Sequence, residues 1–415
     1  MSSDESLPSG WSFIRIEELR APGEYTFVGG PFGSDLTARD YVPAPGVPVI
    51  RGVNLGGAED RFVDEDFVFV SDKKAKKLVR NLAFPGDLVF TQRGTLGQVA
   101  VIPQTARFDR YVISQSQMKL TPDPSRAESR FLYHYFRAPR TRRRLLSRTQ
   151  ATGVPHINLG ILKSFGVAVP SLPEQRRIAD VLDRAEALRA KRRAALAKLD
   201  AFTQSIFFEL FGDGRDRRFP TEKLSDCAEI VSGVAKGRKL NGGPIVQAPY
   251  LRVANVQAGF LDLTEVKSID ALPSEIEELR LLSGDVVLTE GGDFDKLGRG
   301  AMWNGEIPGC IHQNHVFRVR VWSEVLQPRF FHEFLQTRAA KAYFLRCAKR
   351  TTNLASINMT QLRALPIPLP PPSLQNEFAE RAAAVERLKA TQQASLAKLD
   401  ELFASLQDRA FRGEL

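Results

Sequence analysis

The sequence predicts an α+β protein in which two similar mixed α/β globular domains are joined by two long helices packed as an antiparallel coiled coil. Three observations support this fold class. The pentapeptide LAKLD occurs at 196–200 and again at 396–400. Each copy lies in a stretch whose apolar residues recur at steps of three and four, as in an amphipathic helix. Each stretch follows about 170 residues in which strand and helix patterns are mixed.

The repeat extends well beyond LAKLD. At a spacing of 200 residues, Ile157-Asn158 matches Ile357-Asn358 and Gln175 matches Gln375. Further upstream the spacing becomes 198, where GDLVFT at 86–91 matches GDVVLT at 284–289. Self-similarity over such a length indicates a tandem duplication of about 200 residues.

The duplication predicts four segments in order. Residues 1–170 form the first globular domain, with strands expected in GDLVFTQ and SQMKLTP and a helix in SRFLYHYFRAPRTRRRLL. Residues 171–213 form the first long helix, 214–370 the second globular domain, and 371–415 the second long helix. In the second domain GDVVLTE and HVFRVRVW are expected to be strands and PRFFHEFLQTRAAKAYFLRC a helix.

Proline-rich stretches, VAVPSLPEQ and PIPLPPPSLQ, precede both long helices. Proline is tolerated in the first turn of a helix but not inside it, so these stretches mark the helix starts. The first helix would be about 60 Å long at 1.5 Å per residue. Antiparallel packing is expected, because parallel packing would require the second domain to return along that whole length.

A narrow apolar stripe on each helix is expected to form the seam between them. Arg192 and Gln392 interrupt the stripe, either to fix the register or as side chains that reach out to solvent. The predicted seam residues are Ile178, Leu182, Leu188, Arg192, Leu196, Leu199, Ile206, Phe378, Val385, Leu388, Gln392, Leu396, Leu399 and Leu406.

Composition narrows the function classes. The net charge of +10 favours a polyanionic partner, although basicity alone is a weak indicator. The N-terminus has no secretory or transit pattern, and no apolar run approaches a membrane span. The three cysteines are scattered, with no CxxC pair, which is typical of reduced thiols in the cytoplasm.

Motifs for catalysis and for metals are absent from the sequence. There is no phosphate-binding GxxxxGK[ST] loop, no GxGxxG turn, and no Asn/Asp-Pro-Pro-Tyr/Phe tetrapeptide of an amino-methyltransferase. Asp285 and Glu290 have the spacing of a metal nuclease, but Gly292 stands where a lysine is expected, and the first copy has Gln92 in place of the acid. The five histidines form no ligand set. We therefore expect no catalytic residue, no bound metal and no cofactor in this chain.

Several polar loops could hold a nucleic acid. Six arginines lie between Arg137 and Arg148 with no acid among them, which indicates either a phosphate-binding surface or a solvated helix face. The segments RGVN and RVAN each contain an Arg and an Asn. These residue types can read guanine and adenine in the major groove, although at a strand end they are more often structural. The candidate DNA-binding residues are Arg51, Asn54, Gln92, Arg93, Thr95, Gln115, Arg143, Arg144, Lys236, Arg238, Lys239, Arg252, Asn255, Lys296, Arg299, Gln313 and Asn314.

Together these segments resemble the specificity subunit of type I restriction-modification systems. The resemblance is carried by LPSGWSFIRIEEL near the N-terminus, GDLVFTQRGTLGQVAV, HINLGILKSFGVAVPSLPEQRRIADVL and its repeat SINMTQLRALPIPLPPPSLQNEF. It covers essentially the whole chain. The second copy departs from the pattern where Ser373-Leu374-Gln375 replaces the Leu-Pro-Glu-Gln form of 172–175.

The resemblance implies two target-recognition domains, each reading one half of a bipartite DNA sequence, with the helices as a ruler between the half-sites. It implies a non-catalytic subunit that binds two methyltransferase subunits, which use S-adenosylmethionine. Restriction and translocase subunits that use ATP and Mg²⁺ complete such an enzyme, which defends the cell against phage. Two alternatives stay open from the residues themselves: a DNA methyltransferase or nuclease with an unrecognised site, and a coiled-coil adaptor that does not bind DNA.

Overall fold

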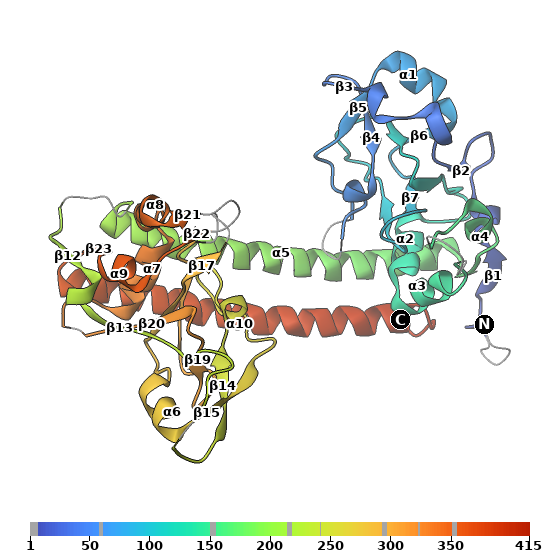
Figure 1. Ribbon diagram of the computed structural model, residues 1–415. Coiled ribbons are helices and arrows are strands. Elements are labelled where there is room, and N and C mark those ends of the chain that lie inside the picture. Colours follow the sequence, from blue (N-terminus) through green and yellow to red (C-terminus); the bar gives the residue numbers. More distant parts are fainter. Residues whose placement is uncertain are drawn as a thin grey trace. The chain divides into compact units, whose positions relative to one another are not determined.

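The computed structural model describes residues 7–57, 61–149, 155–213, 218–240, 242–292, 297–322, 324–350 and 355–415 (Figure 1). The chain divides into two compact units. Unit 1 contains Met1–Ala194 and Ala394–Leu415, and unit 2 contains Ala195–Gln393. The boundary falls inside both long helices, so each unit contains the start of one helix and the end of the other.

The two long helices predicted from the repeat are present. Helix α5 spans Leu172–Phe211 and helix α10 spans Pro372–Ala410. They run antiparallel within each unit. In unit 1, Arg177 and Arg189 of α5 contact Leu415 and Asp400. In unit 2, Lys389 of α10 contacts Asp200 of α5.

A buried glutamine fixes the start of each long helix. In unit 1, Gln175 Oε1 accepts a hydrogen bond from the Glu128 amide over 2.9 Å, and its Nε2 donates to the carbonyls of Arg126 and Pro170. In unit 2, Gln375 makes the same three contacts, to Gln327 N, Val325 O and Pro370 O. The first turn of α10 is therefore held like that of α5, although the residues just before Gln375 differ.

Three sheets build unit 1. Strands β1 and β11 form an antiparallel pair, β2-β10-β7-β8 form an antiparallel sheet, and β3-β5-β4-β9-β6 form a mixed sheet in which β4 and β9 are parallel. Figure 1 shows the mixed sheet, with α1, at the end of unit 1 remote from α5. The bounds are β1 Ser12–Arg15, β2 Phe27–Gly29, β3 Tyr41–Val42, β4 Val47–Ile50, β5 Val68–Val70, α1 Asp72–Lys77, β6 Leu82–Ala83, β7 Leu88–Thr91, β8 Val99–Val101, β9 Tyr111–Ile113, β10 Gln117–Leu120, α2 Ser129–Arg137, α3 Pro139–Leu146, α4 Leu159–Lys163 and β11 Gly166–Val169.

Unit 2 repeats these strand orders. The pair β12-β23 corresponds to β1-β11, the sheet β13-β20-β16-β18 to β2-β10-β7-β8, and β15-β14-β19 to β5-β4-β9, while β17-β22-β21 form a further small sheet. The bounds are β12 Thr221–Lys223, β13 Ala228–Ser232, β14 Val246–Leu251, β15 Lys267–Ala271, α6 Pro273–Leu279, β16 Val286–Thr289, β17 Gly291–Gly292, β18 Gly300–Met302, β19 Ile311–His312, β20 Val316–Val321, α7 Pro328–Gln336, α8 Arg338–Cys347, β21 Lys349–Arg350, β22 Ala355–Ser356, α9 Met359–Arg363 and β23 Pro366–Pro368. The predicted α+β fold with an internal repeat is confirmed.

Each single helix predicted before a long helix is in fact two helices. In unit 1 the chain turns at Ala138, because Pro139 disfavours the helical conformation of the residue before it. In unit 2 it turns at Thr337, whose hydroxyl accepts a hydrogen bond from Ala340 N and caps α8. Helices α2 and α7, which precede the breaks, bury aromatic residues, among them Phe131 and Phe136 of α2 and Phe330 and Phe334 of α7.

Each unit has its own apolar core, and each core includes parts of both long helices. In unit 2, Phe330 of α7 packs on Phe207 and Phe211 of α5, with ring centroids 5.4 and 4.8 Å apart, and Phe378 of α10 packs on Phe207. In unit 1, Phe411 packs on Phe131 of α2, with centroids 5.7 Å apart. In the described part of the chain, no helix is long and apolar enough to cross a membrane.

Candidate nucleic-acid interface

Three loops of unit 1 meet where β2, β7 and β10 end or begin, and we call residues 30–36, 92–97 and 114–117 the unit 1 loop cluster. The Gly30 amide donates to Gln117 O and the Gln92 amide to Ser116 O, both over 2.7 Å. A Cβ on Gly30 would lie 2.0 Å from Ser114 O, so only glycine permits this approach. The backbone of the cluster is therefore fixed by the sheet beneath it.

Unit 2 builds the same arrangement from residues 233–240, 290–292 and 313–315, the unit 2 loop cluster. The Val234 amide donates to His312 O over 2.9 Å, and the Glu290 amide to His315 O over 3.0 Å. A Cβ on Gly233 would lie 1.8 Å from His312 O. The two clusters share a backbone framework, but they carry different side chains.

In unit 1 the structure brings four of the candidate residues together. Arg93 and Thr95 are exposed and Gln92 is half-buried in the same loop. Gln115 lies in the neighbouring loop, but its Nε2 donates to the carbonyls of Gly33 and Leu36. Arg93, Thr95 and Gln92 are thus accessible to a ligand, whereas the amide donor of Gln115 holds a loop in place.

In unit 2 the accessible candidates are Lys236, Lys239, Gln313 and Asn314, of which the two lysines are exposed and the other two half-buried. The Arg238 guanidinium instead makes two hydrogen bonds to Glu275, at 2.6 and 2.8 Å. Arg299 is half-buried and donates to Gln257 Oε1 over 2.8 Å. Lys296 lies outside the described residues.

The interpretation of Asn54 and Asn255 as base-reading residues is wrong. Both side chains are buried, 0% and 2% exposed. Asn54 Oδ1 accepts from Arg51 N, and its Nδ2 donates to the carbonyls of Val63 and Glu65. A buried amide whose donors and acceptor are all engaged by the backbone cannot reach a base edge.

Asn255 has the equivalent bonds in unit 2, to Arg252 N, Asp262 O and Glu265 O. The adjacent arginines are also used locally. Arg51 donates to Asp66 O over 3.0 Å, and Arg252 donates to Glu265 O over 3.2 Å. The segments RGVN and RVAN therefore have a structural role, because each of them fixes one loop in its unit.

Arg143 and Arg144 lie apart from the loop cluster. With Phe13, Tyr135 and Phe411 they line a cavity of about 630 Å³ whose lining includes no loop-cluster residue. Arg144 stacks on Phe165 at 4.5 Å from the ring centroid and donates to Tyr135 Oη over 3.0 Å, which joins α3 to the core. Arg144 is a packing residue, and Arg143 is an exposed one.

Among the predicted seam residues, two equivalent positions are exposed and the others are buried or half-buried. Ile178, Leu182, Ile206, Phe378 and Val385 are buried. The half-buried positions are Arg192, Leu196, Leu199, Gln392, Leu396, Leu399 and Leu406.

Leu188 and Leu388 do not belong to the seam, because they are 53% and 46% exposed. After the buried Ala185, the next residue that faces inward is Arg189, four residues on, and not Leu188, three residues on. The Arg189 guanidinium stacks on Phe403 at 4.4 Å and lies 2.5 Å from Asp400. The aliphatic part of a long basic side chain can cover apolar surface. A pattern drawn from apolar residues alone does not include such a side chain.

A partly buried ionic network joins a loop of unit 1 to α5. Arg61 contacts Asp183 and Glu186 at 2.6 Å each, and His134 Nε2 lies 2.7 Å from Asp183. Burial alone would raise the pKa of Asp183, but the hydrogen bonds from His134 and Arg61 lower it well below its usual range. The carboxylate is held charged, as a structural connection would require.

The two acidic residues that have the spacing of a metal nuclease, Asp285 and Glu290, have local partners. Asp285 is buried, accepts from Leu282 N and is bound by Arg320, so it supports the turn before β16. Glu290 contacts His315 Nδ1 over 2.5 Å. The described part of the chain contains no group of three or more His, Cys, Asp or Glu residues that could hold a metal ion.

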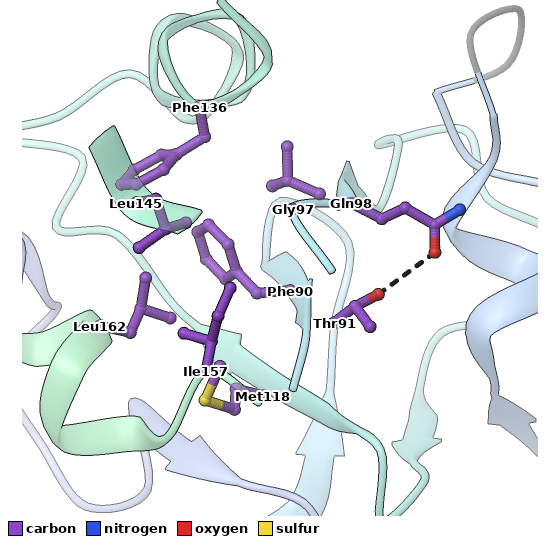
Figure 2. A pocket seen from close by; sticks show the side chains of 10 residues that line it. Phe90, Thr91, Gly97, Gln98, Met118, Phe136, Leu145, Ile157 and Leu162 are labelled. Atoms are coloured by element: carbon purple, nitrogen blue, oxygen red, sulfur yellow. Dashed lines mark hydrogen bonds between the residues drawn. The ribbon is translucent and has the colours of Figure 1, made fainter. Parts of the chain in front are cut away.

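The cavity beneath the 92–97 loop is also not a ligand site (Figure 2). It is lined mainly by apolar side chains, among them Phe90, Met118 and Phe136, and its volume is about 10 Å³. That is room for about one water molecule and not for a base. Thr91 and Gln98 face each other across a 3.3 Å hydrogen bond at its edge.

Phe32 is a residue of the unit 1 loop cluster that was not among the sequence candidates. It is 88% exposed. Its surroundings in the sequence, Gly-Gly-Pro-Phe-Gly, indicate a tight turn. No periodic pattern shows that an aromatic residue in such a turn faces solvent.

The fold and the loop clusters define a class of protein: one with two structurally equivalent recognition units carried on paired helices. Residues 17–198 match the family model described as the type I restriction modification DNA specificity domain. The specificity subunit of the type I restriction enzyme EcoKI from Escherichia coli (strain K12) is 22% identical over 99% of this chain and 90% of its own length.

Solved structures have the same fold. A chain from a study of assembly and conformational transition in a type I restriction-modification system has a TM-score of 0.59 at 18% identity, covering 99% of this chain and 100% of that one. The S subunit of such a system from M. genitalium has a TM-score of 0.54 at 14% identity, covering 99% and 98%. The chain belongs to the specificity subunits of type I restriction-modification systems. It is accordingly the DNA-recognition subunit, which is non-catalytic.

Proposed function

We propose that each unit reads one half of a bipartite DNA target through its loop cluster, residues 1–170 forming the first recognition domain and 214–370 the second. One observation carries the proposal: the two clusters share their backbone framework, including the close approach at Gly30 and Gly233, but differ in their accessible side chains. A shared framework with different contacts suits two different half-sites. Arg93 with Thr95 in unit 1, and Lys236 with Lys239 in unit 2, are the proposed contacts.

The long helices, within residues 171–213 and 371–415, are the proposed ruler between half-sites. Their charged and apolar seam contacts keep the two helices in one register. Deleting one heptad from each helix should change the tolerated gap and leave both half-sites unaltered. An altered half-site with an unchanged gap would mean that the helices are not the spacer.

The same helices offer two equivalent pairs of exposed apolar residues for partners. In unit 1, Leu188 and Leu402 are 53% and 49% exposed. Leu188 immediately precedes Arg189, and Leu402 lies two residues after Asp400, the ion-pair partner of Arg189. Phe202 and Leu388, 53% and 46% exposed, hold the corresponding places in unit 2. Two equivalent surfaces suit two copies of one partner, and we propose that two methyltransferase subunits dock there.

The proposed complex assigns its chemistry to the partners. S-adenosylmethionine would be bound by the methyltransferase subunits, and ATP and Mg²⁺ by restriction and translocase subunits. A cytoplasmic location follows from the same proposal, since genomic DNA is the substrate that such a complex protects. Leu188→Asp with Leu402→Asp should weaken methyltransferase binding, whereas Lys398→Asp, an exposed change on the same helix, should not.

Selection of duplexes from a random pool by the full-length chain tests the proposal. The expected product is two fixed half-sites separated by a gap of constant length, with affinity that falls steeply as salt rises. Replacing residues 214–370 by those of another family member should then change one half-site only. Selection of no common sequence, or turnover of DNA by the purified chain with S-adenosylmethionine and Mg²⁺, would contradict it.

A further inference from the structure

Phe32 stands at the tip of the 30–36 loop, and it is the most exposed large apolar side chain in the described part of the chain, at 88%. Other large apolar side chains are exposed as well, but the next most exposed, that of Phe208, is 63% exposed. Phe32 shares its loop cluster with the accessible polar residues Gln92, Arg93 and Thr95. The ring therefore lies on the surface that the proposed function assigns to DNA.

The loop holds Phe32 in a fixed position. The Gly30 amide donates to Gln117 O over 2.7 Å, and Asn81 Nδ2 donates to Gly29 O over 2.8 Å. On the other side of the tip, Gln115 Nε2 donates to Leu36 O over 2.7 Å, and the Asp35 amide donates to Phe32 O over 2.9 Å. The backbone on both sides of Phe32 is thus hydrogen-bonded to neighbouring segments, namely β10 and Asn81 on one side and the loop at Gln115 on the other.

Unit 2 has the same loop without the ring. The close approach of Gly233 to His312 O matches that of Gly30 to Ser114 O. Two residues after each glycine stand Phe32 in unit 1 and Ala235 in unit 2, and Ala235 is followed by the exposed Lys236. The framework therefore does not require an aromatic residue at the tip, and the packing of unit 1 does not use it.

We propose that Phe32 is a wedge that enters a base step of the half-site read by unit 1 and partly unstacks it. This inference rests on the proposed function. A flat apolar ring can replace the stacking that a base loses, and apolar wedges of this kind kink the duplex. Pyrimidine–purine steps unstack most easily, so the wedge favours such a step without a hydrogen bond to either base.

The test uses the full-length chain and the duplex that it selects from a random pool, with 2-aminopurine placed at successive positions of each half-site. The fluorescence of 2-aminopurine rises when it is unstacked. Wild-type protein should raise the signal at one step in one half-site. Phe32→Trp, which keeps a flat ring, should retain the rise, and Phe32→Ala should abolish it and weaken binding about tenfold or more.

Phe260→Ala is the matched control, because Phe260 is 61% exposed but lies outside both loop clusters. It should leave the signal and the affinity unchanged. Since Phe32 is exposed, its variants should unfold at the wild-type temperature, so that weakened binding reports on contact and not on folding. A Phe32→Ala protein with wild-type affinity and a wild-type fluorescence rise would overturn the wedge alone. A wild-type chain that selects no bipartite duplex would overturn the proposed function and the wedge together.

Discussion

Arg189 Nε of α5 lies 2.5 Å from Asp400 Oδ1 of α10, and Lys389 Nζ of α10 lies 2.7 Å from Asp200 Oδ1 of α5. The two aspartates are the last residues of the two LAKLD copies, and the two bases are also 200 residues apart. Each LAKLD copy therefore supplies the aspartate of an ion pair with the other helix, and each unit contains one such pair. Its leucines are half-buried beside that pair.

Removing one of these pairs should weaken its unit slightly. Arg189 is 13% exposed but Asp400 is 41% exposed, so solvent screens the interaction. In a double-mutant cycle of Asp400→Asn with Arg189→Met, we expect a coupling of about 0.5 kcal/mol, smaller in 1 M salt. Urea unfolding measures it. Asp408→Asn, in an exposed pair with Arg412, is the control, and a coupling of zero at low salt would contradict the prediction.

Replacing either helix-start glutamine should be much more damaging. Gln175→Leu removes three hydrogen bonds and leaves a backbone amide and two carbonyls without their partner in a buried place, which should destabilise unit 1 by about 3 kcal/mol. Gln375→Leu should do the same to unit 2. The measurement is chemical unfolding followed by circular dichroism. Gln204→Leu, on an exposed face of α5, should change little, and an equal effect of all three variants would contradict the assignment.

Asn255 and Asn314 should respond in opposite ways. Asn255→Leu removes buried bonds to the backbone and should lower the free energy of unfolding by about 2–3 kcal/mol, with no change in the selected half-site. Asn314→Ala, at a half-buried position of the unit 2 loop cluster, should leave stability nearly unchanged and alter binding. Thermal unfolding and duplex selection distinguish the two. A changed half-site for Asn255→Leu would restore the base-reading interpretation.

Lys236 and Lys239 should act on phosphate and not on bases. Each change to alanine should weaken binding to all duplexes alike and reduce the slope of log affinity against log salt by about 0.9. Fluorescence anisotropy titrations between about 50 and 200 mM salt provide the measurement. Lys398→Ala, on an exposed position of α10, should keep the wild-type slope. Loss of affinity for one sequence only would indicate base contact.

The stability of unit 2 should fall in mild acid. Burial lowers the pKa of His312 to about 4 from its ordinary value of 6.5. Between these values the unfolded chain takes up the proton and the folded chain does not, so stability is full above pH 6.5 and is lost as pH falls toward 4, by up to about 3 kcal/mol. His312→Asn should flatten this pH dependence, measured by urea unfolding at several pH values. An unchanged slope would mean that other groups cause the loss.

Much of the fold could be predicted because it repeats. The spacing of Gln175 and Gln375, and of the LAKLD copies, indicates the duplication. The apolar period predicts the two long helices, and the short connections predict that they are antiparallel. The break at Pro139 was visible as a proline, but Thr337 at the equivalent break has no such signal. Leu188 was misassigned because steps of three and four fit the same stripe, and only packing shows that Arg189 turns inward.

The candidate interface was predicted less well, for a physical reason. Exposed Arg93 and buried Asn54 are both polar residues beside loops, and the sequence does not show which of them the backbone will bind. Phe32, the proposed wedge, is not a candidate from the sequence, since a phenylalanine is expected to be buried unless a structure shows otherwise. Accessibility, more than residue type, separates the proposed contact residues from the supporting residues.

Unit 1 is built from two chain segments that are far apart in the sequence, and this has a consequence during synthesis. Ala410, with no exposed surface, and Gln407 belong to unit 1, although the rest of that unit is complete at Ala194. Ribosomes add about 5–20 residues per second, so roughly 10–40 s pass between the synthesis of Ala194 and that of Ala394–Leu415, the C-terminal segment of unit 1. Unit 2 is contiguous and can close earlier. We therefore expect the unit that is translated first to finish folding last, with the surface that Gln407 and Ala410 will cover accessible to chaperones and proteases during that interval.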